Sequence, residues 1–204
     1  LGLMMCLSPL AAHAHGSDRP EEVGQYFRQS WWLVVLLTLV TVTGLLLAGP
    51  VLVAIGIDAA VADLAARYCM AMACGTPAAV SFLAMRYTSE GVGWTRPMLI
   101  RALLGLVANA IGNYAFMYGK WGMPALGAVG TGVSTALVQW LVFASMWLYM
   151  AQHSVYRPYR LWSRIEWPDF VRLGEMLRIG LPISGSVLAE GALFVSAGLM
   201  MGAL

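Results

Sequence analysis

Five long apolar segments constrain the fold of this chain more than any other feature of the sequence. They lie at about 31–57, 62–85, 97–117, 126–150 and 179–204. A helix of about 20 apolar residues crosses the hydrocarbon core of a bilayer, and only helices or closed barrels satisfy their backbone groups there. The segments are continuous rather than alternating, which favours helices over barrel strands. The sequence therefore predicts an all-α, polytopic transmembrane helix bundle.

Composition excludes most soluble classes of protein. Of the 204 residues, 60% are hydrophobic and 11% are charged, and the mean hydropathy is +0.73. A water-soluble domain of this size does not need so many apolar residues, so we expect an integral membrane protein. The sequence has no H-E-x-x-H motif and no serine nucleophile elbow. Gly119-Lys120 is followed by Trp121 and opens no phosphate loop. We therefore expect neither an enzyme, nor a cofactor, nor a nucleic-acid partner.

The first fourteen residues are mostly apolar and run into Ala-His-Ala-His at 12–15, which loosely resembles a signal peptide. The basic region that normally begins a signal peptide is missing. We therefore interpret the start of the chain as the later part of a transmembrane helix, and the chain as a piece of a larger protein.

Basic residues predict the orientation of the helices. Because successive helices cross the membrane in opposite directions, every second connection lies on the same side of it. Three such connections, with the helix ends beside them, hold ten of the twelve basic residues: Arg19, Arg28, Arg86, Arg96, Arg101, Arg157, Arg160, Arg164, Arg172 and Arg178. Only Arg67 and Lys120 fall on the other side. Because lysine and arginine are retained on the cytoplasmic side of a membrane, we expect the ten-residue side to be cytoplasmic.

The longest polar segment divides the chain into predicted domains. Residues 151–175 are basic and contain Pro158 and Pro168, which suits a cytoplasmic linker between two helical bundles. We therefore predict a partial N-terminal bundle over 1–150, and the first helix of a C-terminal bundle over 176–204.

Glu190 is the only acidic residue that lies deep in an apolar segment. It follows Arg178 by twelve residues, or about 18 Å along a helix, and no charged residue follows it. An acid at that depth costs about 3 kcal/mol on insertion scales, so such residues usually serve a function. Burial raises the pKa of a carboxyl and a nearby cation lowers it, so one site can exchange a proton, a metal ion or an organic cation. The alternative is a protonated or hydrogen-bonded acid used for helix packing.

Two further features of the apolar segments are candidates for the site. Asn109 and Asn113 are four residues apart, so both amides lie on one helix face. They either join helices by hydrogen bonds or line a polar cavity, and the sequence leaves both interpretations open. Pro182 precedes Glu190 and marks either the start of its helix or a bend in it.

Small residues at the start of the fourth segment predict close helix packing. These residues are Gly127, Gly130, Gly132 and Ser134.

Three stretches of the chain resemble one family of transporters. They are the charged loop 86–97, the run 109–132 from Asn-Ala-Ile-Gly-Asn-Tyr to Gly-Thr-Gly, and Arg-Ile-Gly-Leu-Pro at 178–182 with Glu190 eight residues later. These stretches are similar to the fifth to seventh helices of the multidrug and toxic compound extrusion (MATE) transporters, in their NorM-like branch. The resemblance spans essentially the whole chain. It implies twelve helices in two six-helix bundles, of which this chain holds the end of helix 2 through helix 7 and lacks helix 1.

The resemblance also assigns roles to the candidate residues. Glu190 matches the acid of the C-terminal bundle that is tied to cation binding, and Asn109 and Asn113 match polar residues of the N-terminal bundle. The implied protein is a monomeric antiporter of the bacterial inner membrane, surrounded by lipid, that exports organic cations or amphipathic drugs by alternating access. The coupling ion is Na⁺ or H⁺, and a Na⁺ at Glu190 is the only metal ion expected.

Two other functions remain open. One is a lipid-linked oligosaccharide flippase of the same superfamily, which the acidic character of Glu190 disfavours. The other is a non-transporting membrane scaffold or receptor.

Overall fold

All regular elements are helical over the residues that the computed structural model describes, 2–163 and 166–202. In chain order they are η1 (Gly2–Cys6), α1 (Leu7–Gly16), α2 (Pro20–Ala54), α3 (Ala59–Gly91), α4 (Arg96–Tyr118), α5 (Ala128–Gln152), η2 (Ser154–Tyr159) and α6 (Phe170–Gly202). The predicted all-α bundle is confirmed. Each predicted apolar segment corresponds to one of the helices α2 to α6, and all five are long and apolar enough to cross a membrane.

Two helices begin well before the apolar segments that predicted them. Helix α2 begins at Pro20, since the fixed backbone angle φ of proline suits the first turn of a helix. Glu21 and Glu22 in this turn suit the positive end of the helix dipole. Helix α6 begins at Phe170, inside the segment predicted as a linker. The Asp169 side chain accepts hydrogen bonds from the backbone of Val171 and Arg172, and so caps the helix.

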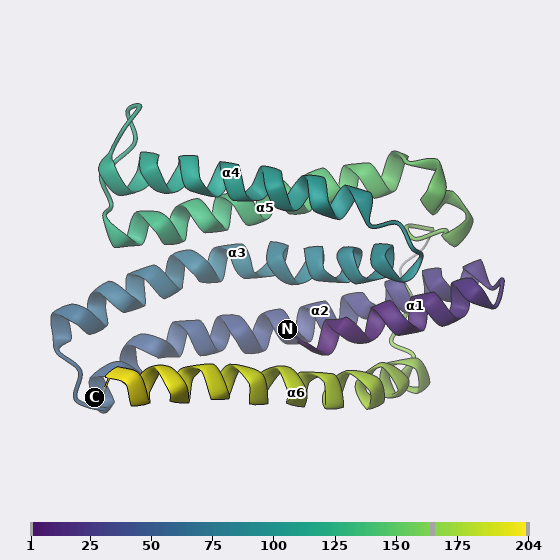
Figure 1. Ribbon diagram of the computed structural model, residues 1–204, viewed down its shortest axis with the longest axis horizontal. Coiled ribbons are helices and arrows are strands. Elements are labelled where there is room, and N and C mark those ends of the chain that lie inside the picture. Colours follow the sequence, from purple (N-terminus) through teal and green to yellow (C-terminus); the bar gives the residue numbers. More distant parts are fainter. Residues whose placement is uncertain (1, 164–165, 203–204) are drawn as a thin grey trace.

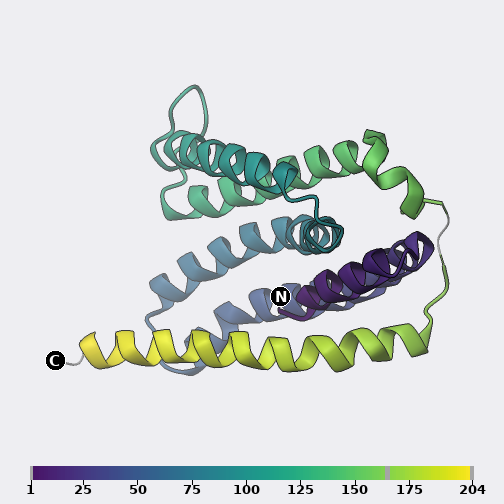
Figure 2. The same cartoon turned by 45° about the vertical axis from the view of Figure 1, so that its right-hand side comes forward.

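The helices lie side by side in one elongated bundle (Figure 1). Helix α3 packs against α2 and α5, and α4 packs against α5. Helix α6 lies on the other side, against η1 and α2, and Figure 2 shows the same order after a turn of the view. Helices α2 and α3 therefore separate α6 from the α4–α5 pair.

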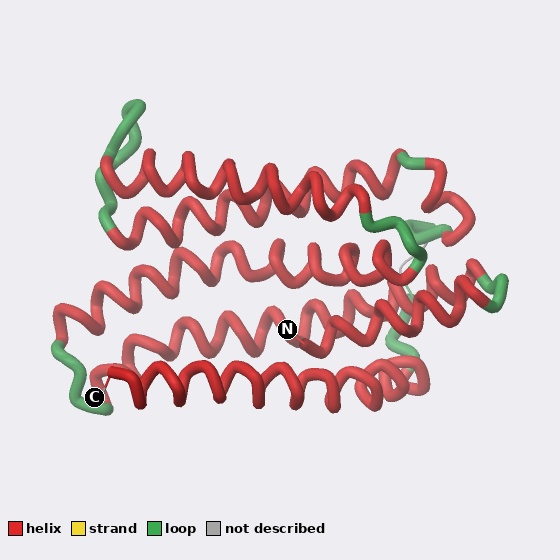
Figure 3. The backbone as a smooth tube through the Cα atoms, viewed as in Figure 1, coloured by secondary structure: helices red, strands yellow, loops and turns green. Residues whose placement is uncertain are grey.

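The connections gather at the two ends of the bundle (Figure 3). The α1–α2 turn, the α3–α4 loop and the connection from η2 to α6 share one end, which we call the basic end because it holds the predicted cluster of arginines. The α2–α3 and α4–α5 loops lie at the opposite end. The structure thus groups the loops as the sequence predicts. Arg164 lies outside the described residues.

Close helix packing occurs at three of the four small residues predicted for it. A methyl group on Gly130 would collide with the Phe116 carbonyl of α4, and one on Gly132 would crowd α3. Ser134 is buried. Gly127 does not pack closely, because a methyl group added there would meet no other atom within 4 Å, and its φ of 56° marks the turn that precedes α5.

Candidate ion and substrate site

The two asparagines of α4 form a hydrogen-bonded series that crosses to α5. The Asn113 amide donates to Oδ1 of Asn109 at 3.0 Å, and the Asn109 amide donates to the Thr135 hydroxyl at 3.1 Å. The Thr135 hydroxyl donates in turn to the Thr131 carbonyl at 2.8 Å. Both asparagines are half-buried. Their spacing therefore places both amides on one face, as predicted, and that face lies along the seam between α4 and α5.

Glycine lets the two helices approach at this seam. A methyl group on Gly112 would collide with the Ser134 side chain, and one on Gly105 would crowd Val142. The Asn109 amide can then reach a hydroxyl of the neighbouring helix, that of Thr135. Thr135 was missed at the level of sequence, although Thr131 and Thr135 repeat the four-residue spacing of the asparagines.

One acceptor in this series has no partner among the described residues. Oδ1 of Asn113 is buried and accepts no hydrogen bond there. The series of hydrogen bonds is therefore incomplete at this oxygen. A buried carbonyl oxygen without a hydrogen-bond partner lowers the stability of the folded protein. An amide oxygen without a partner can accept a hydrogen bond or coordinate a cation.

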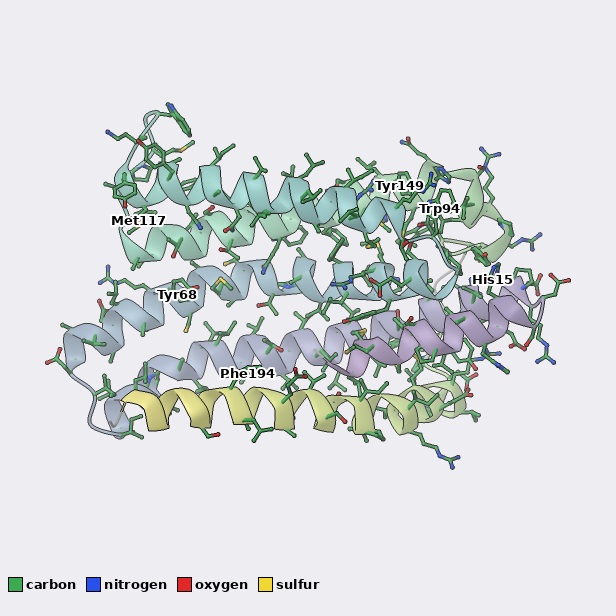
Figure 4. All side chains as sticks on the ribbon, in the orientation of Figure 1. His15, Tyr68, Trp94, Met117, Tyr149 and Phe194 are labelled. Carbon is green, nitrogen blue, oxygen red and sulfur yellow. The ribbon has the colours of Figure 1, made fainter. Side chains whose placement is uncertain are left out.

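Glu190 lies on the other side of the bundle. It is on the exposed surface of α6, and no ion pair or hydrogen bond holds its side chain among the described residues. Figure 4 labels Phe194, one turn after Glu190 on α6, and Met117 near the end of α4; α2 and α3 lie between the two helices. The structure therefore does not bring Glu190 together with Asn109 and Asn113.

Pro182 does not mark the start of a helix. Helix α6 begins twelve residues earlier, at Phe170, and continues past the proline. The helix-start interpretation is therefore wrong, because the Asp169 cap begins the helix before the apolar segment does. Proline inside a helix removes one backbone hydrogen bond, so a bend at Pro182 stays a prediction.

No three His, Cys, Asp or Glu side chains come together as a metal site within the described part of the chain. A Na⁺ at Glu190 would need oxygen ligands in addition to this carboxylate.

A polar network at the basic end is the main feature that the sequence did not predict. Arg28, which is buried, pairs with Glu166 at 3.0 Å and donates to the Arg160 carbonyl at 2.7 Å. Gln29 donates to the Trp167 carbonyl and accepts from the backbone N–H of Asp169, each at 2.9 Å. These contacts join α2 to residues more than 130 positions later in the chain. Sequence reasoning treated Arg28 only as an indicator of topology.

A second group of aromatic and hydroxyl contacts lies at the same end and involves α3 and α5. The Trp94 indole N–H donates to the Tyr149 hydroxyl at 2.9 Å, and Figure 4 shows the two side chains together near the basic end. The Tyr156 hydroxyl of η2 shares a 2.6 Å hydrogen bond with Ser89. Burial raises the pKa of Tyr156 to about 12, so this phenol stays protonated at neutral pH. The guanidinium of Arg101 lies 4.4 Å from the centroid of the Tyr149 ring.

Comparison with known proteins agrees with this architecture. A model of the MatE family matches residues 1–115, which is more than half of the chain. Over all 204 residues the chain is 35% identical to the multidrug resistance protein MdtK of Klebsiella pneumoniae subsp. pneumoniae. It is 34% identical to MdtK of Klebsiella pneumoniae strain 342. The match covers 45% of each relative, so the chain spans about half the length of these curated relatives.

Solved structures show the same fold at lower identity. A crystal structure of a MATE protein in complex with MaD3S superposes with a TM-score of 0.82 and 22% identity, over 95% of this chain and 43% of that one. The eukaryotic MATE transporter AtDTX14 gives a TM-score of 0.78 and 21% identity, over 89% and 39%. A MOP superfamily transporter from Pyrococcus furiosus also gives 0.78 and 21%, over 95% and 42%.

The family model, the relatives that match over all 204 residues of this chain and the shared helical bundle lead to one identification. The chain belongs to the MatE family of multidrug and toxic compound extrusion (MATE) proteins, which are multi-pass membrane transporters rather than enzymes.

Proposed function

We propose that this chain is part of a cation-coupled antiporter that exports organic cations or amphipathic drugs by alternating access. The names of its MdtK relatives, which are multidrug resistance proteins, support drug export. Because the chain spans 45% of those relatives, the activity is proposed for the whole protein that contains it. That protein is a monomer of the bacterial inner membrane, with residues 1–150 in one bundle, 151–175 between the bundles and 176–204 in the second.

Glu190 carries this proposal. It is the only charged residue of α6 after Arg178, on a helix apolar enough to cross a membrane. Its side chain is exposed on α6 and has no ionic partner within the described residues, so it is open to an exchangeable cation. A carboxylate of this kind binds either the coupling ion, Na⁺ or H⁺, or the drug cation. Loading one then releases the other, which couples the two fluxes.

Asn109 and Asn113 have a separate role in the proposal. They line the cavity of the N-terminal bundle, where the unpaired Oδ1 of Asn113 accepts a hydrogen bond from the drug or contacts its charge. Since α2 and α3 separate them from Glu190, the two sites act on different sides of this helix group. A bend of α6 at Pro182 would let the Glu190 segment move relative to the part of α6 that packs against η1.

Neutralising Glu190 tests the proposal directly. Glu190→Gln in the full-length protein keeps size and hydrogen bonding but cannot exchange charge. In bacteria that lack their own drug pumps, we expect this variant to accumulate ethidium to the level of cells without the transporter. Glu21→Gln, an exposed glutamate at the basic end, is the matched control and should export normally. Wild-type export by Glu190→Gln at equal membrane expression would show that Glu190 is structural.

The coupling ion can be identified in the same system. Purified full-length protein in vesicles should export drug only when an inward gradient of the coupling ion is imposed. Separate Na⁺ and H⁺ gradients distinguish the two ions. Export that ignores both gradients would contradict antiport.

A further inference from the structure

A group of exposed aromatic side chains lies at the end of the bundle opposite the basic end. Tyr114 and Tyr118 come from the last turns of α4, and Trp121 comes from the loop between α4 and α5. The ring centroids lie 5.6 Å apart for the two tyrosines and 6.0 Å apart for Tyr114 and Trp121. The rings contact one another, yet in chain order they are 49%, 59% and 72% exposed. We call these three residues the aromatic cluster.

Backbone contacts hold the loop that carries Trp121 against the end of α4. The N–H of Lys120 donates to the Ala115 carbonyl, and the N–H of Leu126 donates to the Phe116 carbonyl, each at 3.0 Å. Figures 1 and 2 show the loop standing sideways from the bundle instead of continuing along its axis. Trp121 has a φ of 57°, a left-handed conformation that is unfavourable for a bulky residue. The loop thus holds a tryptophan outside the bundle in a strained conformation.

The polar atoms of the aromatic cluster have no partner within the described part of the chain. The hydroxyl groups of Tyr114 and Tyr118 and the indole N–H of Trp121 make no hydrogen bond there. Each of these side chains combines an apolar ring with a polar tip. Tyrosine and tryptophan gather at membrane surfaces for this reason, because the ring prefers hydrocarbon and the tip prefers the lipid headgroups.

The aromatic cluster lies at the end of an exposed apolar face of α4. Leu104, Val107 and Ile111 precede Tyr114 and Tyr118 at helical spacing, and these three aliphatic side chains are more than half exposed. Helix α4 is long and apolar enough to cross a membrane, and little of it is buried against the other helices. Because the chain belongs to a family of membrane transporters, hydrocarbon is the environment that suits this face. The cluster then lies at the level of the lipid headgroups.

Lys120 adds a positive charge that its own helical hairpin does not neutralise. No acidic residue occurs between Glu90 and Glu166, so the hairpin of α4 and α5 contains no carboxylate at all. Lys120 is exposed and forms no ion pair with any described residue. An anion that binds it must therefore come from outside the hairpin.

The acidic residues at the α2–α3 connection, at the same end, already have partners. The Asp58 side chain accepts hydrogen bonds from the backbone of Ala60 and Val61 and so caps α3. Asp63 pairs with Arg67 at 2.9 Å. The phosphate groups of phospholipids are the anions that the surface of a membrane supplies beside the aromatic cluster, and they complement the charge of the lysine.

We propose that the aromatic cluster and Lys120 form a docking surface for phospholipid headgroups, in the leaflet at this end of the bundle. The rings lie at the boundary of the hydrocarbon, and Lys120 contacts a lipid phosphate. This contact fixes the α4–α5 hairpin at one depth in the membrane. It involves neither Glu190 nor the two asparagines of α4, so it does not depend on drug export.

The depth of a spin label tests the docking surface. Met123, two residues after Trp121, is 44% exposed and serves as the labelling site. Full-length protein that carries Met123→Cys, with alanine in place of the native cysteines, is labelled in nanodiscs of phosphatidylethanolamine and phosphatidylglycerol. Collisions of the label with oxygen, which concentrates in hydrocarbon, and with a water-soluble nickel chelate measure its depth.

We expect the label on Met123→Cys to lie at the level of the lipid phosphates, where both reagents reach it only in part. A label that meets the nickel chelate as often as a spin label free in solution would place the loop in water and overturn the proposal. A label shielded from both reagents would place a protein surface over the loop, and would overturn it as well.

Matched variants assign the contact to individual residues. Trp121→Asn removes the ring but tolerates the left-handed backbone, and should raise collisions with nickel at least about twofold, whereas Trp167→Asn at the basic end should not. Lys120→Gln should raise them in the same direction, whereas Arg67→Gln, whose arginine is paired with Asp63, should leave them unchanged. If the label keeps its depth in both Trp121→Asn and Lys120→Gln, the helices alone set the position of the loop and the proposal is wrong.

Discussion

At the scale of the residue, Gly112 decides how closely α4 and α5 approach. Its missing side chain leaves room for Ser134, and this close contact lies beside the hydrogen bond between Asn109 and Thr135. The polar series and the tight seam therefore depend on one another, because widening the seam would lengthen that hydrogen bond.

Gly112→Ala should destabilise the protein. The added methyl group meets Ser134, and overpacking of this kind costs about 1–3 kcal/mol. Gly44→Ala in α2 is the matched control, since a methyl group at Gly44 would meet no neighbouring group within 4 Å and alanine favours the helix. Thermal unfolding of the full-length protein in detergent should show a lower midpoint for Gly112→Ala alone. Equal midpoints for the two variants would mean that α4 and α5 accommodate the added methyl group without a loss of stability.

Single cysteines at Asn109 and Asn113 test whether the amides line a wet cavity. We expect both to react with small polar thiol reagents and to be protected by bound substrate, because the proposed function places them in a cavity where the unpaired Oδ1 of Asn113 binds the drug. The background carries alanine in place of the native Cys6, Cys69 and Cys74. If both cysteines stay unreactive, and Asn109→Ala and Asn113→Ala export drugs normally, the pair serves only to join α4 to α5.

The sequence predicted part of this seam and not the rest. Four-residue spacing was enough to place Asn109 and Asn113 on one face, because helical periodicity is a local property. Their partner Thr135 lies 26 residues after Asn109, and only the packing of two helices brings it within reach. The sequence places Glu190 far from other charges in an apolar segment, and its depth in a membrane stays a prediction, but its separation from the asparagines depends on the order of the helices.

At the scale of the element, the connection between η2 and α6 is fixed to α2 by buried polar contacts. The Arg28–Glu166 pair is one of these, and its buried guanidinium also donates to the Arg160 carbonyl. The Gly24 backbone packs so closely against the Tyr159 carbonyl that a side chain at Gly24 would collide with it. This segment therefore packs as part of the bundle.

Breaking the buried pair should cost far more than breaking an exposed one. Arg28→Gln removes a buried guanidinium together with its pairing to Glu166 and its hydrogen bond to the Arg160 carbonyl, and hydrogen bonds of a charged group contribute about 1.5–3 kcal/mol. Arg19→Gln breaks the Arg19–Glu22 pair, which is 64% and 36% exposed, and should cost less than about 1 kcal/mol. Equilibrium unfolding in mixed detergent micelles measures both. If both variants lose less than about 1 kcal/mol of unfolding free energy, the Arg28 pair behaves as a solvated ion pair, which would contradict the prediction.

The boundaries of the elements show what hydropathy can and cannot predict. It detects the part of a helix that lies in hydrocarbon, so it found all five long helices. It missed the polar first turns of α2 and α6, because Pro20 and Asp169 begin those helices outside the apolar segments. It could not detect the Arg28–Glu166 contact, which joins residues 138 positions apart.

At the scale of the whole molecule, the two ends of the bundle differ in charge. The basic end collects the arginines of three connections, while the opposite end has Arg67, paired with Asp63 at 2.9 Å, and Lys120. Because positive residues are retained in the cytoplasm, we predict that the basic end is cytoplasmic.

Thiol labelling of intact cells tests this orientation. In the full-length protein without native cysteines, Ser163→Cys at the basic end should resist a membrane-impermeant maleimide. Ala59→Cys, exposed at the opposite end, is the matched control and should react. After the cells are opened, both should react. Rapid labelling of Ser163→Cys in intact cells, with protection of Ala59→Cys, would reverse the topology.

Gln29 has a mechanical consequence for this molecule. Its side chain holds the chain on both sides of Pro168, at the Trp167 carbonyl and the Asp169 N–H, and α6 begins at the next residue. Two hydrogen bonds therefore fix the connection to α2 directly before α6 begins. Because Gln29 lies in the third turn of α2, a displacement of this part of α2 should move the first turn of α6 with it.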